Sequence, residues 1–272
     1  MPVPVLVLDV LDFLFAHPEV VPDFVDEGFA DRHDEVVFVF GFGSGSTIQY
    51  DASAKSYSLA AGGSSGTDTF VSSERDGSAP SGNQRYVKSD GRTFTVTQPI
   101  VAGRGFDYLR FARLTTKQSD GTPIAVSFVT GVVTRGVDVP SSGSVTLSRT
   151  AVTGEAYVTA NGTTTAYSLG RSTLTISIDF AAGRVTGRMV LIGTPINGGA
   201  DVTLSTIDAN VDFSGTGTVT PVSGDFTPNA NSYLAGAFFG PRANETGLLL
   251  SLQGSSASGA RLTLIASGAG GS

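Results

Sequence analysis

The side chains that most often act as general bases or bind transition metals are nearly missing from this sequence. The chain has 272 residues, no cysteine and only two histidines, His17 and His33, both within the first 43 residues. From residue 44 onward, the roles of nucleophile, general base or metal ligand would fall on carboxylates, lysines or tyrosines. Zinc or haem-iron sites built from imidazole or thiolate are therefore excluded there.

The acidic residues after position 43 number 15, and they are scattered singly along the sequence. No two of them have a spacing that is typical of acid–base catalysis. Glu245 could be a catalytic acid, but its place in a turn favours a structural role, as the partner of a nearby backbone group or arginine. We predict no enzymatic activity, no catalytic residue, no metal site and no cofactor.

A second candidate is a stretch that places basic and aromatic side chains close together. Residues 106–115 contain Tyr108, Arg110, Phe111 and Arg113. They could form an aromatic and basic patch that contacts a ligand. They could also form a half-buried strand that leaves both arginines in solvent. Both interpretations remain open at this stage.

The composition is typical of an all-β protein and argues against a nucleic-acid partner. The chain has 35 glycines and no tryptophan, and it is rich in serine and threonine, which favours short strands and many turns. The net charge of −7 is unevenly distributed: residues 1–43 hold nine acidic residues against one arginine, and the rest holds 15 acidic and 16 basic residues. A nearly neutral body lacks the basic face that nucleic acids attract.

Residues 1–43 differ in composition from the rest of the chain. Residues 1–40 contain no serine, threonine, asparagine, glutamine, lysine or tyrosine. The apolar run at residues 3–15 has no basic region before it and is too short for a transmembrane helix, so it predicts neither a signal peptide nor a membrane span. We expect an atypical acidic extension that is unpacked or results from a misassigned start. An acidic docking segment is the alternative.

After this extension, the pattern is one of short strands and polar turns. Residues 47–50 and 56–60 predict a hairpin. Residues 62–91 predict a long polar loop with at most one strand. Further strands are predicted at residues 93–98, 106–115 and 124–133.

A boundary is predicted at residues 137–143, where proline, glycine and two serines interrupt strand formation. It separates a β-rich handle domain, residues 44–140, from a second domain, residues 141–272. In the second domain, the alternation of apolar and polar residues becomes much cleaner, as in strands 172–180 and 184–192. About eight such strands predict an eight-stranded antiparallel β-barrel that is filled by side chains or holds one small ligand. The strands are too short, and lack aromatic girdles, for a membrane-spanning barrel.

The most distinctive motif lies near the C-terminus, between two apolar runs. Residues 238–247 read Phe-Phe-Gly-Pro-Arg-Ala-Asn-Glu-Thr-Gly. Glycine and proline permit the backbone angles of a tight reversal, so a hairpin is predicted. The residues that define the motif are Phe238, Phe239, Gly240, Pro241, Ala243, Glu245 and Gly247.

This motif resembles the last barrel hairpin of the bacterial transferrin-binding protein B family of surface lipoproteins. Residues 178–187 and 130–145 resemble two further segments of that family. The resemblance spans roughly residues 44–272 and implies a handle domain followed by an eight-stranded barrel. It covers one lobe, as in single-lobe transferrin-binding-like members. It also implies display at the outer membrane or cell surface, although the chain lacks the cysteine that a lipid anchor needs.

The resemblance implies a non-catalytic solute-binding protein that captures a protein ligand through its loops. Iron or haem carriers of a host, or another surface ligand, are the partners that it implies. We expect no nucleic-acid partner, and we expect that the protein does not itself span the membrane. The ligand-binding residues are not identified by the sequence. A structural or adhesive surface protein is the alternative, supported by the Gly/Ser/Thr-rich composition.

Overall fold

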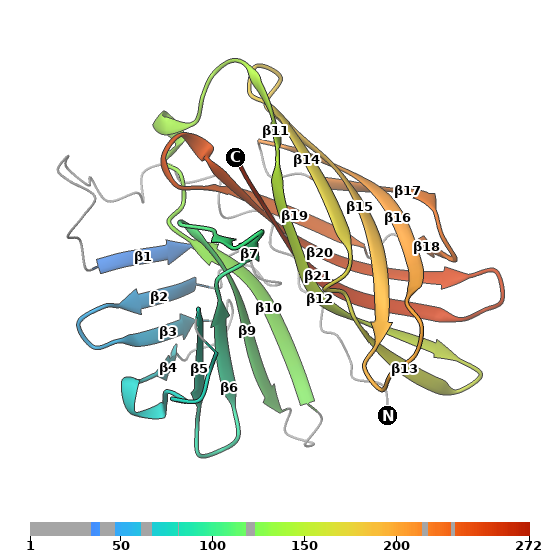
Figure 1. The fold of residues 1–272 in the computed structure, drawn as a ribbon, viewed down its shortest axis with the longest axis horizontal. Helices are drawn as coiled ribbons and strands as arrows, with labels where there is room; N and C mark the ends of the chain where they lie inside the picture. Colours follow the sequence, from blue (N-terminus) through green and yellow to red (C-terminus); the bar gives the residue numbers. More distant parts are fainter. Residues whose placement is uncertain are drawn as a thin grey trace.

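The structure is a computed structural model that describes residues 34–38, 47–60, 67–80, 82–117, 123–213, 217–229 and 232–272. Its regular elements are antiparallel β-strands and three-residue 3-10 turns. The strands form two four-stranded sheets, one eleven-stranded sheet and a two-stranded hairpin (Figure 1). The predicted all-β antiparallel architecture is confirmed.

The N-terminal half contains both four-stranded sheets. The first sheet has the order β1 (Asp34–Phe38), β2 (Thr47–Asp51), β3 (Ser56–Ala60) and β4 (Thr67–Phe70). The second sheet has the order β10 (Pro123–Gly131), β9 (Leu109–Lys117), β6 (Thr93–Thr97) and β5 (Asn83–Val87). The small hairpin of β7 (Ile100–Val101) and β8 (Arg104–Gly105) precedes β9.

An aromatic core joins these two sheets. Phe70 of β4 stacks on Phe94 of β6, with ring centroids 5.3 Å apart, and Tyr57 of β3 lies 5.3 Å from the same ring. Tyr86 of β5 meets Tyr57 edge to face at 5.6 Å. All four side chains are buried. Aromatic rings of this size account for most of the apolar area in so small a core.

The predicted hairpin of residues 47–60 is confirmed by the pairing of β2 with β3. The predicted loop at residues 62–91 is wrong in part, because it contains both β4 and β5. Polar composition hid these two strands, and Lys88 and Arg92, in the turn between β5 and β6, form ion pairs with Asp68 of β4 at 3.3 and 2.5 Å. Charged side chains that neutralise one another can cover the solvent face of a strand.

The predicted acidic extension at residues 1–43 lies mostly outside the described residues. Its residues 34–38 form β1, which pairs with β2 in antiparallel register. Pairing along its length satisfies the backbone groups of this short strand. Residues 1–33 and 39–46 lie outside the described residues.

The C-terminal half forms the eleven-stranded sheet. Its strands are β11 (Ser144–Leu147), β12 (Arg149–Ala160), β13 (Thr163–Ser168), β14 (Thr173–Asp179), β15 (Arg184–Pro195), β16 (Val202–Asp212), β17 (Gly217–Ser223), β18 (Phe226–Pro228), β19 (Tyr233–Phe239), β20 (Glu245–Ser256) and β21 (Arg261–Gly271). Eight of them have seven or more residues, and β11, β13 and β18 are shorter. The additional short strands arise where a long strand bends, as between β11 and β12, so their count was not foreseen.

This sheet curls until its two ends come together (Figure 1). A Cβ atom placed on Gly217 of β17 would lie 2.6 Å from the carbonyl oxygen of Leu234 in β19. Within the described residues, no hydrogen-bonded ladder joins β17 to β19. The sheet is therefore a strongly curved barrel-like structure whose hydrogen bonding does not close.

The inside of the curved sheet is filled by aliphatic side chains. Ile176, Leu191, Ile207 and Leu252 belong to its core and are fully buried. On its own strand, each belongs to the row of every second side chain that faces inward, as the period-2 pattern predicted. A core filled in this way resembles a packed domain interior. Ligand contacts therefore have to be sought on the outer surface and at the ends of the sheet.

Strand β20 is buried on both faces. Leu248, Leu250 and Leu252 point into the curved sheet. Leu249 lies on the outer face with Phe111 and Val129 of the N-terminal half. A strand buried on both sides reads as a continuous apolar run, which accounts for the sequence Leu248-Leu249-Leu250. The apolar cluster that contains Leu249, Phe111 and Val129 therefore joins the two halves of the molecule.

Gly247 lies at this junction and leaves no room for a side chain. An added Cβ atom would overlap the side chain of Val129 and lie 2.8 Å from the Phe239 ring. We expect Gly247→Ala to destabilise the fold by about 1–3 kcal/mol, as overpacking does. Gly77→Ala is the control, because nothing lies within 4 Å of its added Cβ. Urea denaturation of both variants measures the difference in their free energies of unfolding. Equal midpoints would show that the junction rearranges to admit the added methyl group.

Candidate binding surface

The motif predicted as a hairpin forms the connection between β19 and β20. Gly240 has φ of 74°, and the 3-10 turn η4 (Pro241–Ala243) follows it. A Cβ atom on Gly240 would overlap the ring of Tyr108, so both the positive φ and the close contact require glycine. Phe239 and Ala243 are buried, whereas Phe238 is half-buried. The turn thus packs against the segment that precedes β9.

Glu245 connects this turn to the N-terminal half. Its Oε1 accepts a hydrogen bond from the backbone N–H of Asp107 at 2.7 Å, and its Oε2 accepts one from Tyr108 at 3.0 Å. The side chain is 2% exposed. Burial raises its pKa, and the two N–H donors oppose that shift. Both oxygens therefore bind backbone groups 137 and 138 residues away in sequence, which is a structural role.

The aromatic and basic stretch lies on and just before β9, and both of its arginines have partners within the protein. Arg110 donates to the carbonyl oxygens of Phe106 and Leu109 at 2.6 and 2.7 Å. Arg113 forms an ion pair with Glu155 of β12 at 2.9 Å. The strand is half-buried, as one interpretation held, but its arginines contact protein atoms. This stretch does not present a free basic patch.

The Arg113–Glu155 pair extends to Tyr157, whose hydroxyl donates to Glu155 at 2.7 Å. Burial, followed by this hydrogen bond to Glu155, raises the pKa of Tyr157 to about 12. The three side chains lie where β9 and β12 face each other, beyond the apolar junction. They form a polar link between the two halves of the molecule.

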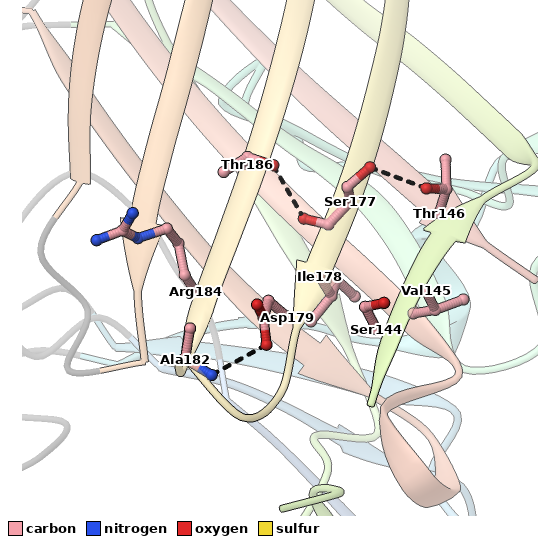
Figure 2. Close-up of a pocket in the computed structure, with 9 residues that line it drawn as sticks. All are labelled: Ser144, Val145, Thr146, Ser177, Ile178, Asp179, Ala182, Arg184 and Thr186. Atoms are coloured by element: carbon pink, nitrogen blue, oxygen red, sulfur yellow. Dashed lines mark hydrogen bonds between the residues drawn. The ribbon is translucent and has the colours of Figure 1, made fainter. Parts of the chain in front are cut away.

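A shallow groove of about 430 Å³ runs along the outer face of β11, β14 and β15 (Figure 2). We call it the side groove. Hydroxyl groups line much of it: Thr146 and Ser177 lie 3.0 Å apart, and Thr186 donates to the carbonyl oxygen of Ser177 at 3.4 Å. Its remaining lining residues are Ser144, Val145, Ile178, Asp179, Ala182 and Arg184.

Two charged side chains in the side groove are only partly engaged. Asp179 accepts a hydrogen bond from the backbone N–H of Ala182 through Oδ1, at 3.0 Å. Figure 2 shows the guanidinium of Arg184 directed away from Asp179, and no ion pair of Arg184 occurs within the described part of the chain. By contrast, Arg188 on the same strand binds both oxygens of Asp208, at 2.7 and 2.9 Å.

Three phenylalanines meet at the end of the curved sheet next to the side groove. Phe180 follows β14, Phe213 follows β16 and Phe238 lies near the end of β19. Their ring centroids are 6.2, 6.1 and 5.0 Å apart, and all three rings are half-buried. They continue the inward-facing rows of their strands. We call this cluster the aromatic mouth.

The sequence placed Phe180 at the end of the predicted strand 172–180 and Phe238 in the hairpin motif, and it singled out no role for Phe213. It gave no signal that the three meet, because their contact depends on the register of strands far apart in sequence. Among the described residues, no group of three or more His, Cys, Asp or Glu side chains could hold a metal ion. The described part also contains no helix with the length and hydropathy needed to cross a membrane.

No protein-family model matches the chain, and no curated protein sequence matches it. A mutant of transferrin-binding protein B from Haemophilus parasuis Hp5 is similar in structure, with a TM-score of 0.45 and 14% sequence identity. Its match covers 85% of this chain and 52% of that chain. The isotype 1 transferrin-binding protein B from serogroup B Neisseria meningitidis has a TM-score of 0.39 and 13% sequence identity to this chain. That match covers 86% of this chain and 51% of the other. The chain thus spans about half the length of these structures, at TM-scores below 0.5.

Glu245→Gln tests the link between the two halves. Glutamine can accept only one of the two N–H bonds and turns its own NH2 group toward the other donor, so we expect a loss of about 1–3 kcal/mol. Asp225→Asn, at an exposed site, is the control. Because the folded pKa of Glu245 is raised, its contribution to stability falls as pH rises from the ordinary value through the raised one. Denaturation midpoints across that window should change less in Glu245→Gln than in the parent protein.

Tyr157 should make the fold more sensitive to alkali. Its folded pKa of about 12 exceeds the ordinary value of 10.0, so the folded state keeps a proton that the unfolded state loses. Stability should then fall as pH rises from 10 to 12. Urea midpoints at the two ends of that window should differ less in Tyr157→Phe than in the parent protein. An identical pH dependence would show that this hydroxyl is not held neutral.

Proposed function

We propose that this protein is a non-catalytic binding protein of a bacterial cell surface that captures a protein ligand through the exposed end of its curved sheet. The observation that carries the proposal is the aromatic mouth beside the side groove. Half-buried aromatic rings next to polar groups without full partners are the usual centre of a protein interface. The motif resemblance of residues 238–247 supports display at the outer membrane.

The filled interior of the curved sheet favours an external ligand. Ile176, Leu191 and Ile207 occupy the space in which an enclosed small molecule would otherwise bind. Loops and strand ends on a rigid scaffold are the usual positions for recognition. A ligand with a surface of its own, such as a protein, can contact the strand ends without entering the sheet.

The contacts of the carboxylates that could act in catalysis support a binding role. Glu245 binds two backbone N–H groups, and Glu155 binds Arg113 and Tyr157. Each therefore stabilises the junction between the two halves. Host carriers of iron or haem are the partner class that the motif resemblance implies, and the transferrin-binding proteins of similar fold carry such a ligand in their name.

The experiment is capture by the purified full-length chain. The protein is immobilised and exposed separately to host serum and to extracts rich in haem proteins, and retained proteins are identified by mass spectrometry. We expect one partner that binds saturably and is displaced by soluble full-length chain. The Gly247→Ala variant, denatured before immobilisation, is the control for adhesion to unfolded chain. Retention of nothing, or of many proteins without saturation, would overturn the proposed function.

A further inference from the structure

The side groove contains a row of hydroxyl groups that crosses three strands. Thr146, Ser177 and Thr186 occupy paired positions on β11, β14 and β15. Adjacent strands lie about 4.8 Å apart, which sets the spacing of the row. Thr146 and Ser177 contact each other at 3.0 Å, and Thr186 donates to the carbonyl oxygen of Ser177. A hydroxyl has one donor and two acceptor positions, so each keeps capacity for a further hydrogen bond.

The next row of the sheet carries charges of both signs. Asp179 and Asp212 lie opposite Arg184 on its two neighbouring strands. Asp179 has one oxygen bound to the N–H of Ala182, and Asp212 has a contact of its own. Two carboxylates beside one guanidinium make this edge unfavourable for an anionic ligand. Among the described residues, no group of three or more His, Cys, Asp or Glu side chains could hold a metal cation here.

The side groove also offers little apolar area to a ligand. Of its two aliphatic lining residues, Ile178 belongs to the interior core and is 1% exposed, and Val145 packs against that core. The volume of about 430 Å³ lies within the range of about 300–1,000 Å³ that is typical of small-molecule sites. The groove therefore has room for a small ligand that is polar and carries no net charge.

We propose that the side groove is a binding site for a neutral saccharide. Carboxylates only accept hydrogen bonds, guanidinium groups only donate them, and hydroxyls do both. A sugar matches all three, because each of its hydroxyls both donates and accepts and the ring carries no charge. The sugar donates to the second oxygen of Asp179, accepts from Arg184 and exchanges hydrogen bonds with the hydroxyl of Thr186. This site goes beyond the proposed protein ligand and does not depend on it.

The test begins with a glycan array. The full-length chain is applied to immobilised neutral, sialylated and sulfated oligosaccharides, and the neutral oligosaccharide with the strongest signal is then used for calorimetry. Two variants change the groove: Thr186→Val removes one hydroxyl at nearly constant volume, and Ala182→Trp fills the groove. The matched controls are Thr165→Val and Ala160→Trp, at exposed positions outside the groove. Thermal unfolding verifies that all four variants fold.

We expect the chain to bind neutral glycans more tightly than sulfated ones, because Asp179 and Asp212 flank the arginine. Thr186→Val should weaken binding about three- to tenfold, as loss of one hydrogen bond does. Ala182→Trp should weaken it at least about tenfold, since the indole ring occupies the place of the sugar. Both controls should bind as the parent chain does. Valine is well tolerated in strands, so Thr186→Val tests the site even if Ala182→Trp fails to fold.

Three results would each overturn the saccharide site. They are the absence of a signal on every neutral glycan, preferential binding of sialylated or sulfated glycans, and equal affinity of the groove variants and their controls. The third result would place the sugar elsewhere on the molecule. The capture of a protein partner does not enter this test, so the proposed function and the saccharide site stand or fall separately.

Discussion

The structure depends on one strand that belongs to two cores. Strand β20 contributes Leu248, Leu250 and Leu252 to the interior of the curved sheet and Leu249 to the junction with the N-terminal half. Any strand in this position has to be apolar on both faces, and its small residues have to admit the side chains of the other half. Gly247 meets the second condition, since Val129 and Phe239 occupy the space beside it. The two halves are therefore held by direct packing rather than by a flexible link.

Polar groups complete this junction at both of its ends. At the start of β20, Glu245 accepts two backbone N–H groups that would otherwise lack partners near the buried Phe106. At the far end, Arg113, Glu155 and Tyr157 form a hydrogen-bonded set between β9 and β12. A buried carboxylate stabilises a structure only when its hydrogen bonds are made, which is why both oxygens of Glu245 are engaged. The charged groups that could suggest catalysis are thus the ones that hold the halves together.

Three aromatic side chains that are only partly buried gather at the end of the curved sheet. Phe180, Phe213 and Phe238 continue inward-facing rows and are partly buried against the interior core. Arg184 remains without an ion pair in the described part, whereas the next outward-facing arginine on its strand, Arg188, is paired. The exposed edges of these rings and the guanidinium of Arg184 are the groups that a partner could contact. This contrast is the physical basis for proposing a binding surface there.

The sequence by itself determined the all-β class, the alternation that marks strands such as β14 and β15, and the reversal between β19 and β20. These are local properties, because the period of two and the backbone freedom of Gly240 act within a few residues. It also indicated that Glu245 is a structural group, but it could not name Asp107 and Tyr108 as its partners. Tertiary structure alone decided the strands hidden in residues 62–91, the pairing of Arg113 with Glu155 and the meeting of the three phenylalanines. Each of these depends on the register between distant strands, which is fixed by side-chain packing across the whole molecule and leaves no pattern in any single stretch of sequence.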